Sequence, residues 1–154
     1  MLPMGAMAPS EDQPGLRLRL AHASRRLPVQ HEFLDALVAT TRRALERSTP
    51  VEAREALHAF RGALESHFAL EEHLHFPALH GLEPSLGAEI EELVREHHAL
   101  RDRVLVIEGR LGREPRDAVA RDFVELGGAM REHEGREERL LAPVETSADG
   151  RSER

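Results

Sequence analysis

Histidine and glutamate residues recur at a fixed offset of 66 positions in the two halves of the chain. Three pairs carry side chains that commonly bind metal ions: His31 and His97, His67 and His133, and Glu71 and Glu137. The same offset relates Glu72 to Glu138 and Pro77 to Pro143. A repeat that preserves imidazoles and carboxylates predicts one site built between two similar helical hairpins.

A metal centre is the simplest use for these six side chains if they lie in a core. Each ionisable group buried without a partner costs about 1–3 kcal/mol, and more when it is charged. A metal removes that cost by making every group a ligand, whereas the alternative is a hydrogen-bonded His/Glu network. Six ligands exceed the four of a structural zinc site. Two carboxylates among four imidazoles favour two carboxylate-bridged first-row metals, with iron preferred over manganese or zinc.

Four amphipathic runs with short connections position these residues. Apolar residues at three- and four-residue spacing predict helices from near Pro28 to Ser48 and over 50–80, 84–112 and 115–144. The short connections predict an all-α, up-down-up-down four-helix bundle. The inward-facing stripe of apolar residues on each helix forms a seam. Apart from Thr41, the six candidate ligands are the only polar residues of this seam. The midpoints of successive histidines fall in the predicted turns, so we expect one histidine from each helix in a single layer. That layer is expected about one turn from the end of the bundle.

Composition and local sequence divide the chain into one domain with two flanking segments. We expect a flexible arm over 1–24, a bundle over 25–145 and a polar tail over 146–154. The formal charge of −7 argues against nucleic acid as the main partner. No apolar run approaches the ~20 residues of a membrane span, and no secretion signal is evident. Since the chain has no cysteine, thiolate metal sites are excluded and a cytoplasmic location is expected.

Three segments together resemble the hemerythrin-like, or HHE cation-binding, domain family. They are His67-Phe-Ala-Leu-Glu71-Glu72 with Phe76-Pro77, Leu93-Val-Arg-Glu96-His97, and His133-Glu-Gly-Arg-Glu137-Glu138 with Pro143; His31 precedes them. The resemblance implies a non-haem di-iron centre bridged by two carboxylates and an oxygen species, with an open position for a small ligand. It assigns the metal to His31, His67, Glu71, His97, His133 and Glu137. Oxygen-carrying hemerythrins have a fifth histidine four residues after the third-helix ligand, where this chain has Arg101.

The expected function is the binding of oxygen, nitric oxide, peroxide or a similar small ligand at the centre. The alternatives are a peroxide- or oxygen-consuming enzyme, catalase-like or oxidase-like, and an iron storage or delivery protein. Residues outside the seam that could replace the fifth histidine are Glu72, Glu138, His98 and His75. The helical register predicts that His97 faces inward and His98 outward. Glu72 and Glu138 are interpreted either as acceptors for ligand histidines or as ordinary surface charges. The sequence leaves the oligomeric state open.

Overall fold

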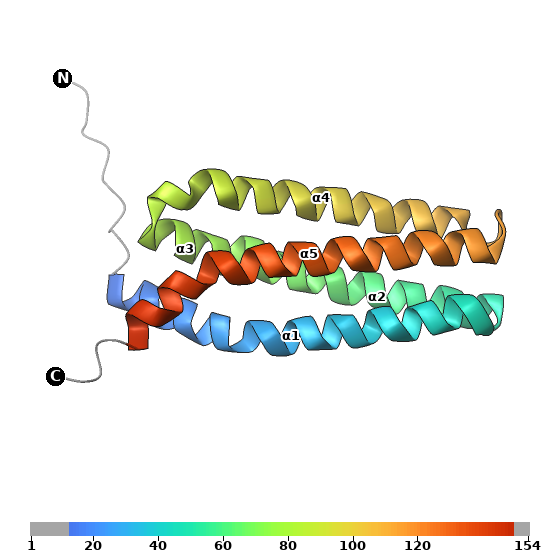
Figure 1. The fold of residues 1–154 in the computed structure, drawn as a ribbon, viewed down its shortest axis with the longest axis horizontal. Coiled ribbons are helices and arrows are strands. Elements are labelled where there is room, and N and C mark those ends of the chain that lie inside the picture. Colours follow the sequence, from blue (N-terminus) through green and yellow to red (C-terminus); the bar gives the residue numbers. More distant parts are fainter. Residues whose placement is uncertain (1–12, 150–154) are drawn as a thin grey trace, which may run out of the picture.

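Four long helical segments, each antiparallel to the one before it in the chain, form the computed structural model, which describes residues 13–149 (Figure 1). The long helices are α1 (Gln13–Arg47), α2 (Pro50–Leu70), α4 (Gly87–Arg110) and α5 (Arg116–Asp149). A π-helical turn η1 (Glu71–His75) and the short helix α3 (Phe76–Leu82) continue α2, and a 3₁₀ turn η2 (Pro84–Leu86) leads into α4. This arrangement confirms the predicted all-α, up-down-up-down four-helix bundle. Within the described range, no helix combines the length and apolar character needed to cross a membrane.

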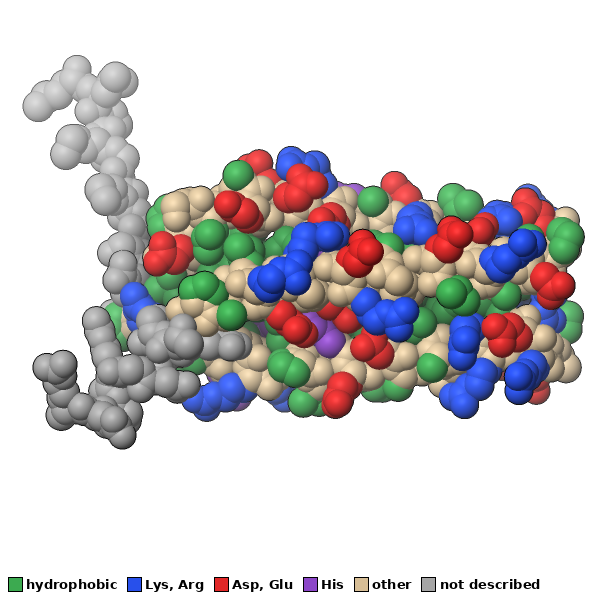
Figure 2. All heavy atoms as spheres, in the orientation of Figure 1, with side chains coloured by type: hydrophobic (Ala, Val, Ile, Leu, Met, Phe, Trp, Pro, Cys, Tyr) green, Lys and Arg blue, Asp and Glu red, His purple; other side chains and the backbone are tan. Residues whose placement is uncertain are grey.

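The connections between the helices follow from local sequence. Thr49 is the N-cap of α2 and forms a capping box with Glu52. The Glu52 amide donates to Thr49 Oγ1 at 3.2 Å, and the Thr49 amide donates to the Glu52 carboxylate at 3.1 Å. Gly112 adopts a φ of +87° after α4, a left-handed conformation that glycine reaches without steric cost. Acidic and basic side chains are interspersed over the exposed face seen in Figure 2, as expected for solvated helix faces.

The core consists of two apolar clusters on either side of the histidine layer. One cluster includes Leu45, Phe60 and Phe123, and lies toward the α1–α2 and α4–α5 connections. The other includes Leu20 and Leu79, and is formed by the chain before His31 and His97 and after the two glutamates. The prediction that the layer lies one turn from the end of the bundle is therefore wrong. Apolar packing closes the layer from both sides.

The start of the first helix differs from the sequence-based expectation. α1 begins at Gln13 and contains Pro28, so residues 13–24 are helical and the prediction of a flexible arm over 1–24 is wrong there. Leu16 and Leu20 are buried against the second cluster. Burial of a leucine contributes about 1.5–3 kcal/mol, which offsets the cost of about 3 kcal/mol of a proline inside a helix. Residues 1–12 lie outside the described part of the chain.

Two further expectations concern the α2 continuation and the C-terminal tail. The three- and four-residue spacing that runs through His67 and Glu71 predicts that Leu74 faces inward, but its side chain is 59% exposed and His75 is buried instead. The π-helical turn η1 inserts an extra residue into the helical period, which rotates the following side chains by about one position. α5 continues to Asp149, so residues 146–149 of the predicted polar tail are helical. Residues 150–154 lie outside the described range.

Candidate metal centre

The structure brings all six candidate ligands into one buried layer between the two apolar clusters. Each side chain is at most 7% exposed, and the two glutamates are the least accessible carboxylates of the described chain. α1 contributes one residue, α2 with η1 two, α4 one and α5 two. The residues are His31, His67, Glu71, His97, His133 and Glu137.

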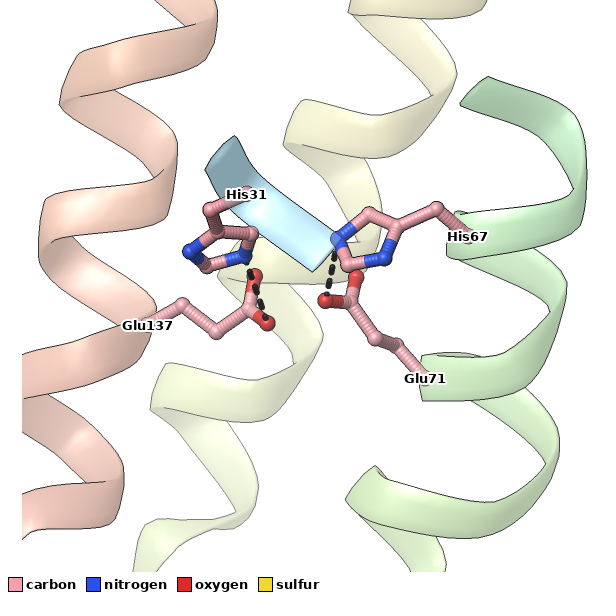
Figure 3. A group of neighbouring side chains, drawn as sticks. All are labelled: His31, His67, Glu71 and Glu137. Atoms are coloured by element: carbon pink, nitrogen blue, oxygen red, sulfur yellow. Dashed lines mark ion pairs between the residues drawn. The ribbon is translucent and has the colours of Figure 1, made fainter. Parts of the chain in front are cut away.

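Both carboxylates lie between two pairs of histidines and present one oxygen to each pair. Glu71 Oε1 lies 2.7 Å from His67 Nε2, and Glu71 Oε2 lies 3.1 Å from His97 Nε2. Glu137 Oε1 lies 3.9 Å from His31 Nε2, and Glu137 Oε2 lies 3.3 Å from His133 Nε2. In Figure 3, four of these side chains converge, with the Glu137 carboxylate beside the His31 ring and the Glu71 carboxylate beside the His67 ring.

These donor atoms form two groups that could each hold a metal ion. His31 and His67 form one group, His97 and His133 form the other, and Glu71 and Glu137 belong to both. Within each group, one donor atom from every residue lies within 4.8 Å of the others. The arrangement matches what two cations bridged by two carboxylates require.

Every histidine of the layer is oriented by a hydrogen bond on its outer nitrogen. His31 Nδ1 donates to Glu138 at 2.9 Å, and His97 Nδ1 donates to Glu72 at 2.7 Å. His133 Nδ1 and His67 Nδ1 donate to two further acceptors in the same way, Glu96 at 2.5 Å and Gln30 at 3.1 Å. A neutral ring that carries its proton on Nδ1 presents the lone pair of Nε2 to the centre. This is the tautomer that a metal-binding histidine with an outer acceptor adopts.

The outer acceptors obey the 66-residue offset as well. Glu72 and Glu138 are one repeat pair, and Gln30 and Glu96 are another. Advancing each residue by one repeat, with the second half returning to the first, converts one donor group into the other. The centre therefore has an approximate two-fold relation between its halves. Gln30 is the one departure, because a neutral amide stands where the other half has a carboxylate.

The inner atoms of the layer lack the hydrogen bonds that burial would otherwise demand. Among the described residues, no hydrogen-bond partner exists for Nε2 of His31 and His67 or for either carboxylate oxygen of Glu71 and Glu137. His97 Nε2 and His133 Nε2 lie 2.9 Å apart. Two nitrogens bound at right angles to one cation at about 2.1 Å would lie about 3.0 Å apart. Cations satisfy all of these atoms, so the donor set fits a metal centre better than a hydrogen-bonded network.

Electrostatics of the layer also suit cation binding. Burial lowers the pKa of His67 and of His97 to about 4, so both imidazoles are neutral and available as ligands at neutral pH. Burial raises the pKa of Glu71 and of Glu137, and the neighbouring Glu71 carboxyl group raises that of Glu137 further. A cation between the carboxylates relieves that penalty by pairing with the charged form.

Comparison with protein families gives a match that covers most of the chain. The model of the hemerythrin HHE cation-binding domain matches residues 22–144. The chain belongs to this family. Comparison with curated proteins found no match, and comparison with solved structures found none either. Membership confirms the resemblance predicted from the three motifs and agrees with a cation site in the buried His/Glu layer.

The residue at the position of the fifth histidine does not reach the centre of this hemerythrin-like domain. Arg101 donates through Nη1 to Glu72 at 2.9 Å and through Nε to Glu65 at 2.9 Å. Its guanidinium also lies 5.2 Å from the centre of the Phe68 ring. Partial burial raises the pKa of Glu72, but hydrogen bonds from Arg101 and His97 outweigh this effect and bring it below the ordinary value. Arg101 thus keeps charged the carboxylate that orients His97.

Of the other four residues considered in the sequence analysis, two accept hydrogen bonds from the histidines and two belong to neither donor group. Glu72 and Glu138 are acceptors for two of the histidines rather than ordinary surface charges. His98 is exposed while His97 is buried, which confirms the helical register. His75 is buried beside the layer but belongs to neither donor group.

Sequence reasoning missed two acceptors and one unusual carboxyl. Gln30 and Glu96 could have been found by extending the repeat comparison to the neighbours of the histidines. Glu134 is buried with Oε1 unpartnered among the described residues. Burial, together with the charges of Asp35 and Glu137, raises the pKa of Glu134 to about 8.

Proposed function

We propose that the chain is a non-haem di-iron protein that binds a small ligand such as oxygen, nitric oxide or peroxide inside the bundle. The proposed iron ligands are His31, His67, Glu71, His97, His133 and Glu137. Iron is preferred over manganese or zinc because imidazole and carboxylate donors with open positions are typical of non-haem iron sites. We further propose a cytoplasmic location, in keeping with the absence of cysteine.

The sharing of both carboxylates between the two histidine pairs is the observation that carries this proposal. Each group offers two imidazole nitrogens and two carboxylate oxygens. Four donors from the protein leave positions open on an iron that accepts more than four ligands. A small molecule can therefore reach either ion without displacing a side chain.

The protein contributes orientation and a restricted environment. The outer hydrogen bonds fix each ring with Nε2 toward the centre, as described for His97 and Glu72. The apolar clusters on both sides of the layer limit access to small molecules. Bound iron would supply ligand binding and electron transfer, which these side chains lack. Glu71 and Glu137 would hold the two ions at a fixed separation.

Reaction with peroxide is a second candidate, and iron storage or delivery a third. Arg101 occupies the fifth-histidine position and bonds to Glu72 and Glu65, so the His97/His133 group has no more donors than the His31/His67 group. An iron with fewer protein ligands favours reaction with peroxide over stable oxygen carriage, because metal catalysis needs an accessible coordination position.

Metal analysis combined with spectroscopy tests the proposal. Protein purified with iron is expected to contain about two iron ions per chain, from the two donor groups, and to absorb in the near ultraviolet. The reduced protein is then mixed with oxygen and the oxidised protein with peroxide, while spectra and gas evolution are followed. A reversible oxygen adduct supports carriage, and sustained oxygen evolution that is lost in Glu71→Ala supports an enzyme. Stoichiometric single zinc with no iron absorption after loading contradicts the di-iron proposal.

A further inference from the structure

A cavity separate from the histidine layer lies between the first part of α1 and the η1–α3 segment. Its volume is about 660 Å³, within the range of about 300–1,000 Å³ usual for small-molecule sites. Eight of its fourteen lining residues are apolar. Leu18 and Leu74 line it with side chains that are 73% and 59% exposed. The cavity therefore combines an apolar wall with an open side, which suits a ligand that has an apolar body.

The charge of the lining is the opposite of the charge of the chain. The chain carries 28 acidic residues and a formal charge of −7. None of the fourteen lining residues is acidic, whereas Arg19, His22, Arg26 and His73 are all among them. These four side chains are exposed. They therefore belong to the rim, where an anionic group could contact them and remain partly hydrated.

The least exposed polar lining residues mark the inner wall. His75 is 5% exposed, and burial lowers its pKa, so the ring is neutral and does not itself attract an anion. Gln30 is half-buried and accepts the hydrogen bond from His67 Nδ1 at 3.1 Å. The inner wall is thus uncharged, while positive charge is confined to the rim.

We propose that this cavity binds an aliphatic carboxylate, with its chain along the leucine wall and its carboxylate at the arginine and histidine rim. The wall accounts for the apolar body, because burial of each methylene group against the leucine side chains stabilises the bound form. The rim accounts for the anionic head, because an exposed carboxylate gains from nearby guanidinium groups. The site does not depend on the proposed di-iron centre, although Gln30 makes it adjacent to His67.

Binding of decanoate to the full-length chain tests the proposal, with decanol and decyltrimethylammonium as head-group controls of equal chain length. Calorimetric titrations are run below micellar concentrations, on protein stripped of metal and on protein reconstituted with iron. Decanoate is expected to bind saturably to both forms, at least ten-fold more tightly than either control. Binding to the metal-free form keeps this test distinct from the test of the proposed iron function.

Two substitutions locate the bound molecule. Arg26→Glu at the rim is expected to weaken decanoate binding at least five-fold, and Leu74→Glu at the wall at least ten-fold. Arg42→Glu and Leu105→Glu change exposed residues that do not line the cavity, and are expected to stay within two-fold of the unaltered chain. A cooperative unfolding transition, followed by circular dichroism, verifies that each variant is folded.

Three results would overturn the proposal. The first is the absence of saturable decanoate binding, which would show that the cavity does not take an aliphatic carboxylate. The second is equal affinity for the three head groups, which would remove the role of the rim. The third is equal weakening in the cavity variants and in the Arg42→Glu and Leu105→Glu controls.

Discussion

Substitution of His97 by alanine distinguishes this proposed metal ligand from its sequence neighbour His98. The His97 ring is fully buried, stacked on Phe68 with ring centres 3.8 Å apart and on Phe76 with ring centres 5.6 Å apart. Each such contact contributes about 0.5–1.5 kcal/mol, so metal-free His97→Ala is expected to lose about 1–3 kcal/mol of unfolding free energy. For a chain of this size, that corresponds to a melting temperature lower by about 3–9 °C. The exposed neighbour His98 provides the matched control, and His98→Ala is expected to stay within about 0.5 kcal/mol.

Loss of a metal ligand should also reduce the free energy of unfolding that is gained from bound metal. A cation present at 100 times its dissociation constant stabilises the folded state by about 2.7 kcal/mol. His97→Ala is therefore expected to hold about one cation per chain instead of about two, and to gain about 2.7 kcal/mol less from added metal, by the same relation. The assay combines metal analysis with urea unfolding, with and without a chelator. Retention of both cations by His97→Ala, or loss of metal in His98→Ala, would refute the assignment of α4 to the centre.

Three further predictions concern the surroundings of the centre. Glu134→Gln should stabilise the fold more at pH 8 than at pH 5. The folded chain holds the Glu134 proton up to a pKa of about 8, so the free energy of unfolding falls by up to about 1.4 kcal/mol per pH unit once the same carboxyl ionises in the unfolded chain. Urea unfolding at both pH values measures this, with the exposed Glu132→Gln as control. Gln30→Glu should tighten one cation and Glu96→Gln should loosen the other, each by about ten-fold or more; competition with a chelator would contradict this if both variants matched the unaltered chain. Thr49→Ala should cost about 1 kcal/mol through the lost capping box without changing metal content, and a change in metal content would show that the layer depends on that turn.

The inner layer was predictable because its residues obey two independent rules. The 66-residue offset identified the histidine and glutamate pairs, and the seam register placed them at one height. Both rules depend on regular helices, and the helices that carry His31, His97 and His133 are regular around those positions. The buried and exposed states of His97 and His98 show that a one-residue distinction could be read from the pattern.

Where helices depart from the simple rules, prediction failed for identifiable reasons. The predicted arm over 1–24 contains Leu16-Arg-Leu-Arg-Leu20, whose alternation is not typical of a helix, yet Leu16 and Leu20 are four apart and share one buried helical face. Pro28 suggested a helix start, but tertiary packing outweighed its cost. The π-helical turn after Leu70 has no local sequence marker, so the exchange of Leu74 for His75 could not be foreseen. Gln30 was missed because it differs in type from its repeat partner Glu96, so only a comparison of the residues next to the histidines would mark it.

Because each of the two carboxylates belongs to both donor groups, retention of the proposed metal ions depends on assembly of the whole bundle. The hairpin formed by α1 through α3 supplies three residues of one donor group but only Glu71 of the other, and the α4–α5 hairpin does the reverse through Glu137. Neither hairpin alone can complete a site. Once bound as proposed, each ion is held by side chains from both hairpins, so separation of the hairpins releases both ions together. Such a centre would report a correctly closed tertiary fold, which helical content alone does not do.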